Sequence, residues 1–172
     1  MKFSKISGWF LLAILSICIS ACSSDSDKGD TPEPPEDSSE IIGYWHYIDD
    51  GEEGFYDFRN GNVLNWYVLD EGGLEILNCW YYLDMSKNKL LIWYEADDYD
   101  VYEIRMISNS AFNMAWYDSD ITDVFGSWNK FDVATAKKCI DYVQNNSFDT
   151  VSAVRYSRSS KSELENWINK NS

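Results

Sequence analysis

Short apolar segments alternate with polar turns between residues 41 and 132. The clearest case is 99–107, where Tyr102, Ile104 and Met106 alternate with polar or charged neighbours. A β-strand turns successive side chains to opposite faces, so this alternation is typical of a strand with one buried face. Applied along the chain, the pattern predicts eight strands. They cover residues 42–48, 54–59, 62–69, 74–85, 89–96, 99–107, 111–117 and 122–131.

The turns between these segments are short. Asn60-Gly61, for example, is a strong signal for a two-residue hairpin, because both residues tolerate positive φ. Eight antiparallel strands joined in this way close most simply into an up-and-down barrel, which leaves no strand edge exposed. We therefore predict an all-β fold, an eight-stranded up-and-down antiparallel barrel over residues 41–132. An open or sandwiched sheet of the same strands is the alternative.

The pattern changes after residue 132. Residues 133–146 have helical spacing, and 148–156 are ambiguous. Ser162-Glu163-Leu164-Glu165 resembles a capping box that opens a final short helix. We predict that residues 133–172 form a helical extension packed on the barrel. The buried stripes of the two helices would be Ala136, Cys139, Ile140 and Val143, and then Leu164, Trp167 and Ile168.

The N-terminus has the pattern of a lipoprotein signal peptide. Lys2 and Lys5 precede an apolar run, residues 9–17, that is too short to span a bilayer. Ser20 and Ala21 are small, and Cys22 follows them. We predict that residues 1–21 are removed and that the Cys22 thiol carries lipid, with palmitate among its acyl chains. An uncleaved helix with a core cysteine is the alternative.

Residues 23–40 contain no aromatic or aliphatic side chain, and are rich in acids and proline. Such a composition predicts a solvated, disordered tether between Cys22 and the folded domain. Residues 23–27 resemble an acidic signal that exports lipoproteins to the outer face of the outer membrane, or are simply polar linker. We expect the protein to be attached to the outer membrane by its lipid. The domain then faces either the periplasm or the cell surface.

Charge and composition narrow the classes of partner. The net charge is −15 at pH 7, and loss of Lys2 and Lys5 with the signal peptide makes it more negative. This charge disfavours nucleic acid and direct docking on anionic surfaces. Aromatic residues make up 16% of the chain, a density that suits a β-rich fold or a ring-lined ligand cavity.

Two of the four cysteines are accounted for by processing, because Cys18 leaves with the signal peptide and Cys22 takes lipid. Cys79 and Cys139 remain in the domain. Outside the cytoplasm such a pair can oxidise, so a Cys79–Cys139 disulfide is one hypothesis. Two buried thiols are the other.

The sequence offers little for catalysis or metal binding. His46 is the single histidine, and no serine stands in a nucleophile elbow. Asp118-Ser119-Asp120 has the spacing of the first ligands of a calcium loop, but Asp123 and Asn129 replace the glycine and glutamate that the loop requires. We expect no catalytic residue, no metal site and no cofactor.

Two segments resemble bacterial lipocalin-like lipoproteins. Gly43-Tyr44-Trp45 matches the Gly-x-Trp near the first lipocalin strand, and residues 54–63 look like the second strand and hairpin. The resemblance implies an eight-stranded barrel with Trp45 at its closed end and an interior that binds a small apolar molecule. Eukaryotic lipocalins also keep a Thr-Asp-Tyr loop and an Arg on the last strand that packs on the Trp. This chain has residues 97–99 (Asp-Asp-Tyr) and Lys130 there.

Eight large apolar side chains are the candidates to line such a cavity or its mouth. They are Trp66, Trp80, Trp93, Tyr102, Met106, Phe112, Met114 and Trp116. Alternatively they fill the barrel as core, and a shift of one residue in register would turn any of them to the other face. A different function, a surface accessory or adhesion module for a protein or glycan partner, would need exposed rings instead.

Overall fold

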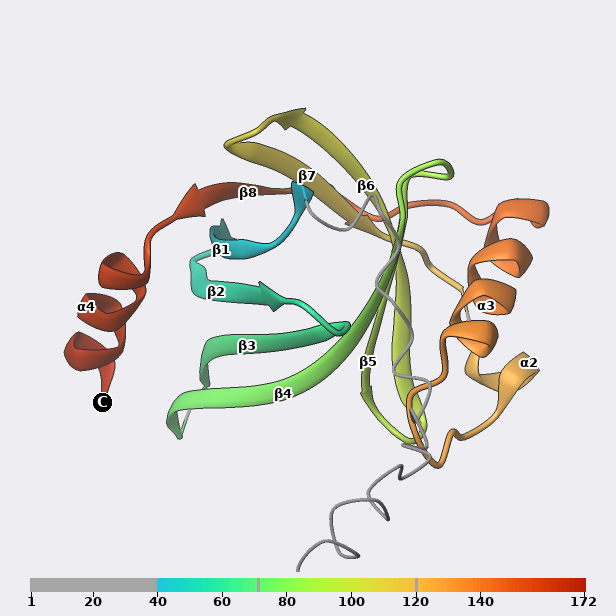
Figure 1. Cartoon of the computed structure of the whole chain (residues 1–172), viewed down its shortest axis with the longest axis horizontal. Coiled ribbons are helices and arrows are strands. Elements are labelled where there is room, and N and C mark those ends of the chain that lie inside the picture. The colour runs from blue at the N-terminus through green and yellow to red at the C-terminus, as the bar shows by residue number, and fades with distance from the viewer. Residues whose placement is uncertain (1–39, 71, 120) are drawn as a thin grey trace, which may run out of the picture. The chain divides into compact units, whose positions relative to one another are not determined.

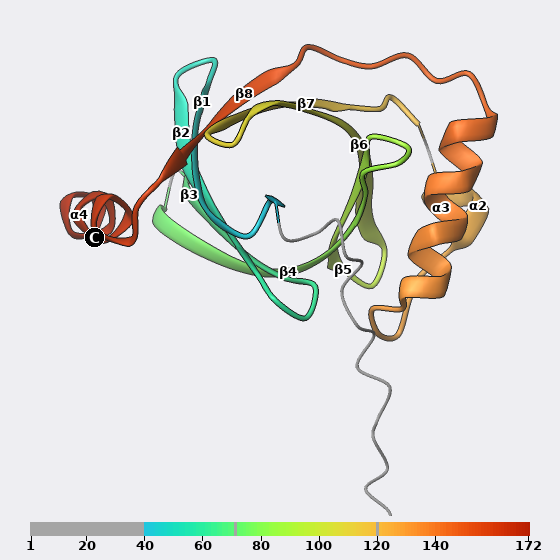
Figure 2. The same cartoon turned by 45° about the horizontal axis from the view of Figure 1, so that its top comes forward.

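A computed structural model describes residues 40–70, 72–119 and 121–172. The predictions of a signal peptide, of lipid on Cys22 and of a tether fall on residues outside this range, apart from residue 40 at the end of the predicted tether. The compact unit is a closed barrel of eight strands, each antiparallel to its neighbours, in sequence order (Figures 1 and 2). The predicted fold class is confirmed. The strands are β1 (Gly43–Asp49), β2 (Glu52–Arg59), β3 (Val63–Asp70), β4 (Gly73–Asp84), β5 (Lys89–Glu95), β6 (Asp98–Ser108), β7 (Ala111–Trp116) and β8 (Val154–Ser159).

The first seven strands lie close to the predicted segments, but the eighth prediction is wrong. Residues 122–131 contain the short helix α2 (Thr122–Phe125) and a loop. The barrel is closed instead by β8, which comes from the ambiguous segment and pairs with both β7 and β1. The boundary at residue 132 therefore does not separate a barrel from an extension.

The rings of residues 122–131 explain the wrong prediction. Trp128 stacks on Tyr99 with ring centres 4.6 Å apart, and Phe131 stacks on Trp80 at 5.7 Å. These rings cover the outer wall of β4, β5 and β6. Aromatic residues favour strands in general, but here the loop uses them for packing from outside.

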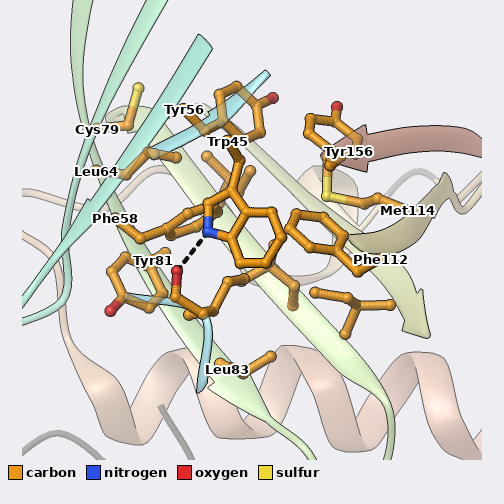
Figure 3. Close-up of a cluster of buried hydrophobic side chains, with 14 of the residues drawn as sticks. Trp45, Tyr56, Phe58, Leu64, Cys79, Tyr81, Leu83, Phe112, Met114 and Tyr156 are labelled. Atoms are coloured by element: carbon orange, nitrogen blue, oxygen red, sulfur yellow. Dashed lines mark hydrogen bonds between the residues drawn. The ribbon is translucent and has the colours of Figure 1, made fainter. Parts of the chain in front are cut away.

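The end of the barrel where the chain enters is closed by Trp45. Its ring is fully buried in the interior cluster and lies edge-on to Phe112, with ring centres 4.6 Å apart (Figure 3). The indole Nε1 donates a hydrogen bond of 2.6 Å to the carbonyl of Ile41 (Figure 3). The position that the resemblance implied for Trp45 is confirmed.

Arg158 of β8 completes this closure. Its guanidinium carbon lies 4.3 Å from the centre of the Trp45 ring. Its nitrogens donate to the carbonyls of Glu40, Ile42 and Asn109 at 2.8–3.0 Å. A cation over an indole face is favourable, and here it also joins three chain segments. The last strand thus carries an Arg that packs on Trp45. Lys130 was compared with this Arg only because residues 122–131 were predicted to be the last strand.

The structure explains why glycine occupies position 43 in the Gly-x-Trp pattern. Its φ is 126°, a conformation that side chains disfavour. A Cβ at this position would also lie 2.9 Å from Nη1 of Arg158. Glycine therefore lets the chain turn into β1 beneath the guanidinium.

Two helices cover opposite outer sides of the barrel (Figure 2). The helix α3 (Val133–Asn145) packs on β4, β5 and β6 through its predicted stripe, which is buried. Asp132 caps it by accepting a hydrogen bond from the amide of Thr135. This cover explains why apolar side chains on both faces of β5 are buried.

The helix α4 (Lys161–Asn171) packs Leu164 and Trp167 against Phe55 and Tyr67 of β2 and β3. Its capping box is formed by Ser160 and Glu163, two residues before the predicted position. None of the helices that the structure describes combines the length with the apolar character of a bilayer-spanning segment.

Candidate ligand site at the open end of the barrel

The two ends of the barrel differ in how they are filled. At the closed end the side chains of Trp45, Phe58, Tyr81 and Leu83 are buried to 1% exposure or less. At the other end, formed by the β1–β2, β3–β4 and β5–β6 turns, two neighbouring hollows open to solvent. Their volumes are about 580 Å³ and about 310 Å³, and Trp66 and Tyr102 line both. We call them together the mouth.

Rings and acids line the mouth together. The larger hollow contains the rings of Trp66, Tyr94 and Tyr102 beside Leu77 and Cys79. The smaller hollow adds more rings, those of Tyr47, Tyr56, Trp116 and Tyr156. The carboxylates that line the mouth are Asp49, Glu52, Glu75, Glu95, Asp98 and Asp100.

Hydrogen bonds between these side chains fix the rings. The indole of Trp66 donates to the Tyr47 hydroxyl at 2.9 Å. The hydroxyls of Tyr94 and Tyr102 are 2.6 Å apart, and that of Tyr102 is 3.5 Å from the carboxylate of Asp100. These hydrogen bonds fix the orientations of four rings that line the mouth, those of Tyr47, Trp66, Tyr94 and Tyr102.

Asp100 is the one partly buried carboxylate among the described residues that line the mouth, and the other five are exposed. Burial raises its pKa above the ordinary value, and the nearby charge of Asp98 raises it further. The hydrogen bonds from Trp116 and Tyr102 act in the opposite direction. The surroundings of Asp100 therefore stabilise its ionised form less well than water does.

The mouth has no positive side chain among the described residues that line it. The acids of the outer surface are different: Glu53 pairs with His46, Asp84 with Lys87 and Glu103 with Arg105. Within the described part of the chain, none of the six mouth carboxylates takes part in an ion pair. The negative charge of the mouth is thus uncompensated by the protein.

The eight predicted cavity residues divide into three groups. Trp66, Tyr102, Met114 and Trp116 line the mouth. Phe112 and Met106 face the interior but pack in the core cluster. Trp80 and Trp93 point outward, which contradicts their predicted role: Trp80 is 40% exposed, and Trp93 packs near Trp128 under the α3 side.

Register explains the two wrong positions. Trp80 and Trp93 are direct partners across β4 and β5, so they share one face. Their neighbours Cys79 and Ile92 belong to the interior cluster. Since both faces of these strands carry large apolar side chains, hydrophobicity alone did not distinguish inside from outside.

The sequence analysis missed Tyr47, Tyr94 and Asp100 as mouth residues. Asp100 lies two residues before Tyr102, on the same face of β6, so period-two alternation from Tyr102 was the signal that indicated it. The tyrosines of β1 and β5 carried no comparable signal, because apolar rings occur on both faces of their strands.

Cys79 and Cys139 are not bonded in the structure, and both are buried. Cys79 faces the barrel interior and Cys139 lies on α3, outside the wall. Burial raises the pKa of each thiol to about 12, so both stay protonated at neutral pH. The disulfide hypothesis is corrected to its alternative, two buried thiols, because the two side chains lie on opposite sides of the sheet.

His46 lies on the outer wall and is not among the residues that line the mouth. Its Nε2 is 2.8 Å from Glu53, and its ring packs on Phe55. In residues 40–172, apart from the two undescribed positions, no three His, Cys, Asp or Glu side chains are grouped closely enough to hold a metal ion.

Comparison of the chain with protein-family models, curated proteins and solved structures gave no match.

Proposed function

We propose that this protein is a membrane-tethered, lipocalin-like lipoprotein that binds a small molecule with an apolar body at the mouth of its barrel. The observation that carries this proposal is the contrast between the two ends. One end is sealed by Trp45 and Arg158, while the other holds a ring-lined hollow of about 580 Å³. Ligand sites for small molecules typically occupy about 300–1,000 Å³ and combine apolar and aromatic side chains with polar groups that fix the ligand. The larger hollow has this size, and five apolar or aromatic side chains line it beside four carboxylates and Asn78.

The membrane part of the proposal rests on the sequence. The charged start, the short apolar run and the small residues before Cys22 favour lipidation at that cysteine. A proline-rich, acidic tether would then hold the barrel away from the lipid surface, where soluble ligands reach the mouth. The outer membrane is the proposed location.

We propose binding without catalysis. The single histidine is engaged with Glu53 on the outer wall, so it does not supply a base at the mouth. The accessory or adhesion reading has weaker support, because the exposed large apolar residues include few rings. They are Ile48, Ile76, Trp80, Ile107, Trp116, Val124 and Val151.

A neutral apolar dye tests the proposal. Nile red, whose emission rises in apolar surroundings, should bind residues 23–172 with one site per chain. Leu77→Trp places a larger ring in the hollow and should weaken binding at least about tenfold. Ile76→Trp adds the same ring to the exposed outer face of the same strand, and should leave the affinity unchanged.

Fluorescence titration of the three proteins measures this difference. Circular dichroism melting checks that both variants fold. If the wild-type chain does not bind the dye, or if Leu77→Trp binds it as tightly as Ile76→Trp, the mouth is not the binding site.

A further inference from the structure

In the larger hollow of the mouth, three aromatic side chains and a partly buried carboxylate are linked by a ring contact and by hydrogen bonds. Trp66 and Tyr94 have ring centres 5.7 Å apart. Tyr94 reaches Tyr102 through their hydroxyls, and Tyr102 is next to Asp100. All four side chains line the same hollow.

The carboxylate in this arrangement lacks what a buried charge requires. Its contacts are a phenol hydroxyl and an indole N–H, which are neutral donors. A partly buried carboxylate without a positive partner is costly, because protein surroundings replace its water only in part. The raised pKa of Asp100 reflects that cost. A positive group entering the hollow would remove it.

The rings and the outer acids favour the same kind of ligand. Aromatic faces attract cations, most strongly where water is excluded. Glu75, Glu95 and Asp98 line the hollow near its opening and add negative potential. A site with this field attracts cations and repels anions of the same shape.

From this arrangement we propose that the ligand is a small organic cation, an amine with a flat or apolar body. Its ammonium group pairs with Asp100, and its body packs against the rings of Trp66, Tyr94 and Tyr102. This inference rests on the proposed function and adds the charge of the ligand to it.

Three probes of the same shape and different charge test the inference: phenethylamine, phenethyl alcohol and phenylacetate. Calorimetry and displacement of Nile red measure their binding to residues 23–172. The amine should bind at least about tenfold more tightly than the alcohol, and phenylacetate should bind most weakly. Equal affinity for amine and alcohol would overturn the inference.

Asp100→Asn keeps the shape and the acceptor oxygen of the side chain and removes its charge. The amine should bind this variant at least about tenfold more weakly, while Nile red and phenethyl alcohol keep their affinities within about twofold. Asp97→Asn, at an exposed position in the β5–β6 turn that does not line the hollow, is the matched control and should leave the amine affinity within about twofold. An unchanged amine affinity in Asp100→Asn would contradict the role of Asp100.

We expect the Asp100→Asn variant to remain folded, so that a weaker amine affinity reports the loss of the charge. Because the pKa of Asp100 is raised in the fold, its ionised form lowers stability at neutral pH, so Asp100→Asn should melt no lower than the wild type. The two proposals also fail differently. Absence of Nile red binding would reject the mouth as a site, whereas Nile red binding without amine preference would reject only the cation.

Discussion

Removal of residues 147–172 is expected to abolish the folded barrel, whereas removal of residues 161–172 should leave it folded. The longer deletion takes away β8, whose ladders join β7 to β1. It also removes Tyr156, which stacks on Phe112 and Tyr56 in the interior. Two strand edges and the interior would then face water. A folded domain is stable by only about 5–15 kcal/mol. We expect the loss of two strand ladders and of the packing around Tyr156 to exceed this free energy of unfolding.

The shorter deletion removes α4 alone and is the matched control. It uncovers Phe55 and Tyr67 on the outer wall, which lowers stability, but it leaves all eight strands paired. Urea unfolding followed by circular dichroism should show a cooperative transition for this variant and none for the longer deletion. A cooperative transition after loss of residues 147–172 would mean that the barrel does not need β8.

Replacement of Trp45 by alanine is expected to lower the free energy of unfolding by about 3–5 kcal/mol, the usual cost of deleting a fully buried large ring. Trp45 is completely buried, packs on Phe112, and forms the surface on which Arg158 rests. The cavity left behind cannot collapse easily, because strands of a closed barrel surround it.

Trp80→Ala is the control for this experiment. Trp80 is 40% exposed and makes one outer stack with Phe131, so its loss should cost about 1 kcal/mol. Urea unfolding at pH 7 compares the two variants with the wild type. Equal losses would contradict the placement of Trp45 as the seal and of Trp80 on the outside.

The local pattern of apolar and polar residues was sufficient to predict seven of the eight strands, because these strands are consecutive and joined by short turns. It failed for β8, which is separated from β7 by a long connection containing α2 and α3. The loop before α3 was predicted to be a strand because it is rich in aromatic residues. Local sequence does not show that these rings pack on the outside of the barrel. Contacts distant in sequence, such as Arg158 on Trp45, decide that choice.

The candidate site was predictable in part for a related reason. In β6 and β7, apolar and polar residues alternate, and Tyr102, Met114 and Trp116 were placed correctly. In β4 and β5 both faces are apolar, because helices and loops cover the outer wall. There the faces of Trp80 and Trp93 depend on tertiary packing and on register, neither of which is visible in one strand.

The most direct test of a ligand site at the mouth uses the indole N–H signals of the tryptophans in a nuclear magnetic resonance spectrum. Titration of residues 23–172 with Nile red should shift the signals of Trp66 and Trp116, which line the mouth. The signals of the outer walls should stay in place: Trp80, Trp93, Trp128 and Trp167. Shifts confined to those outer signals, or no shift at any tryptophan, would contradict a ligand site at the open end of this barrel.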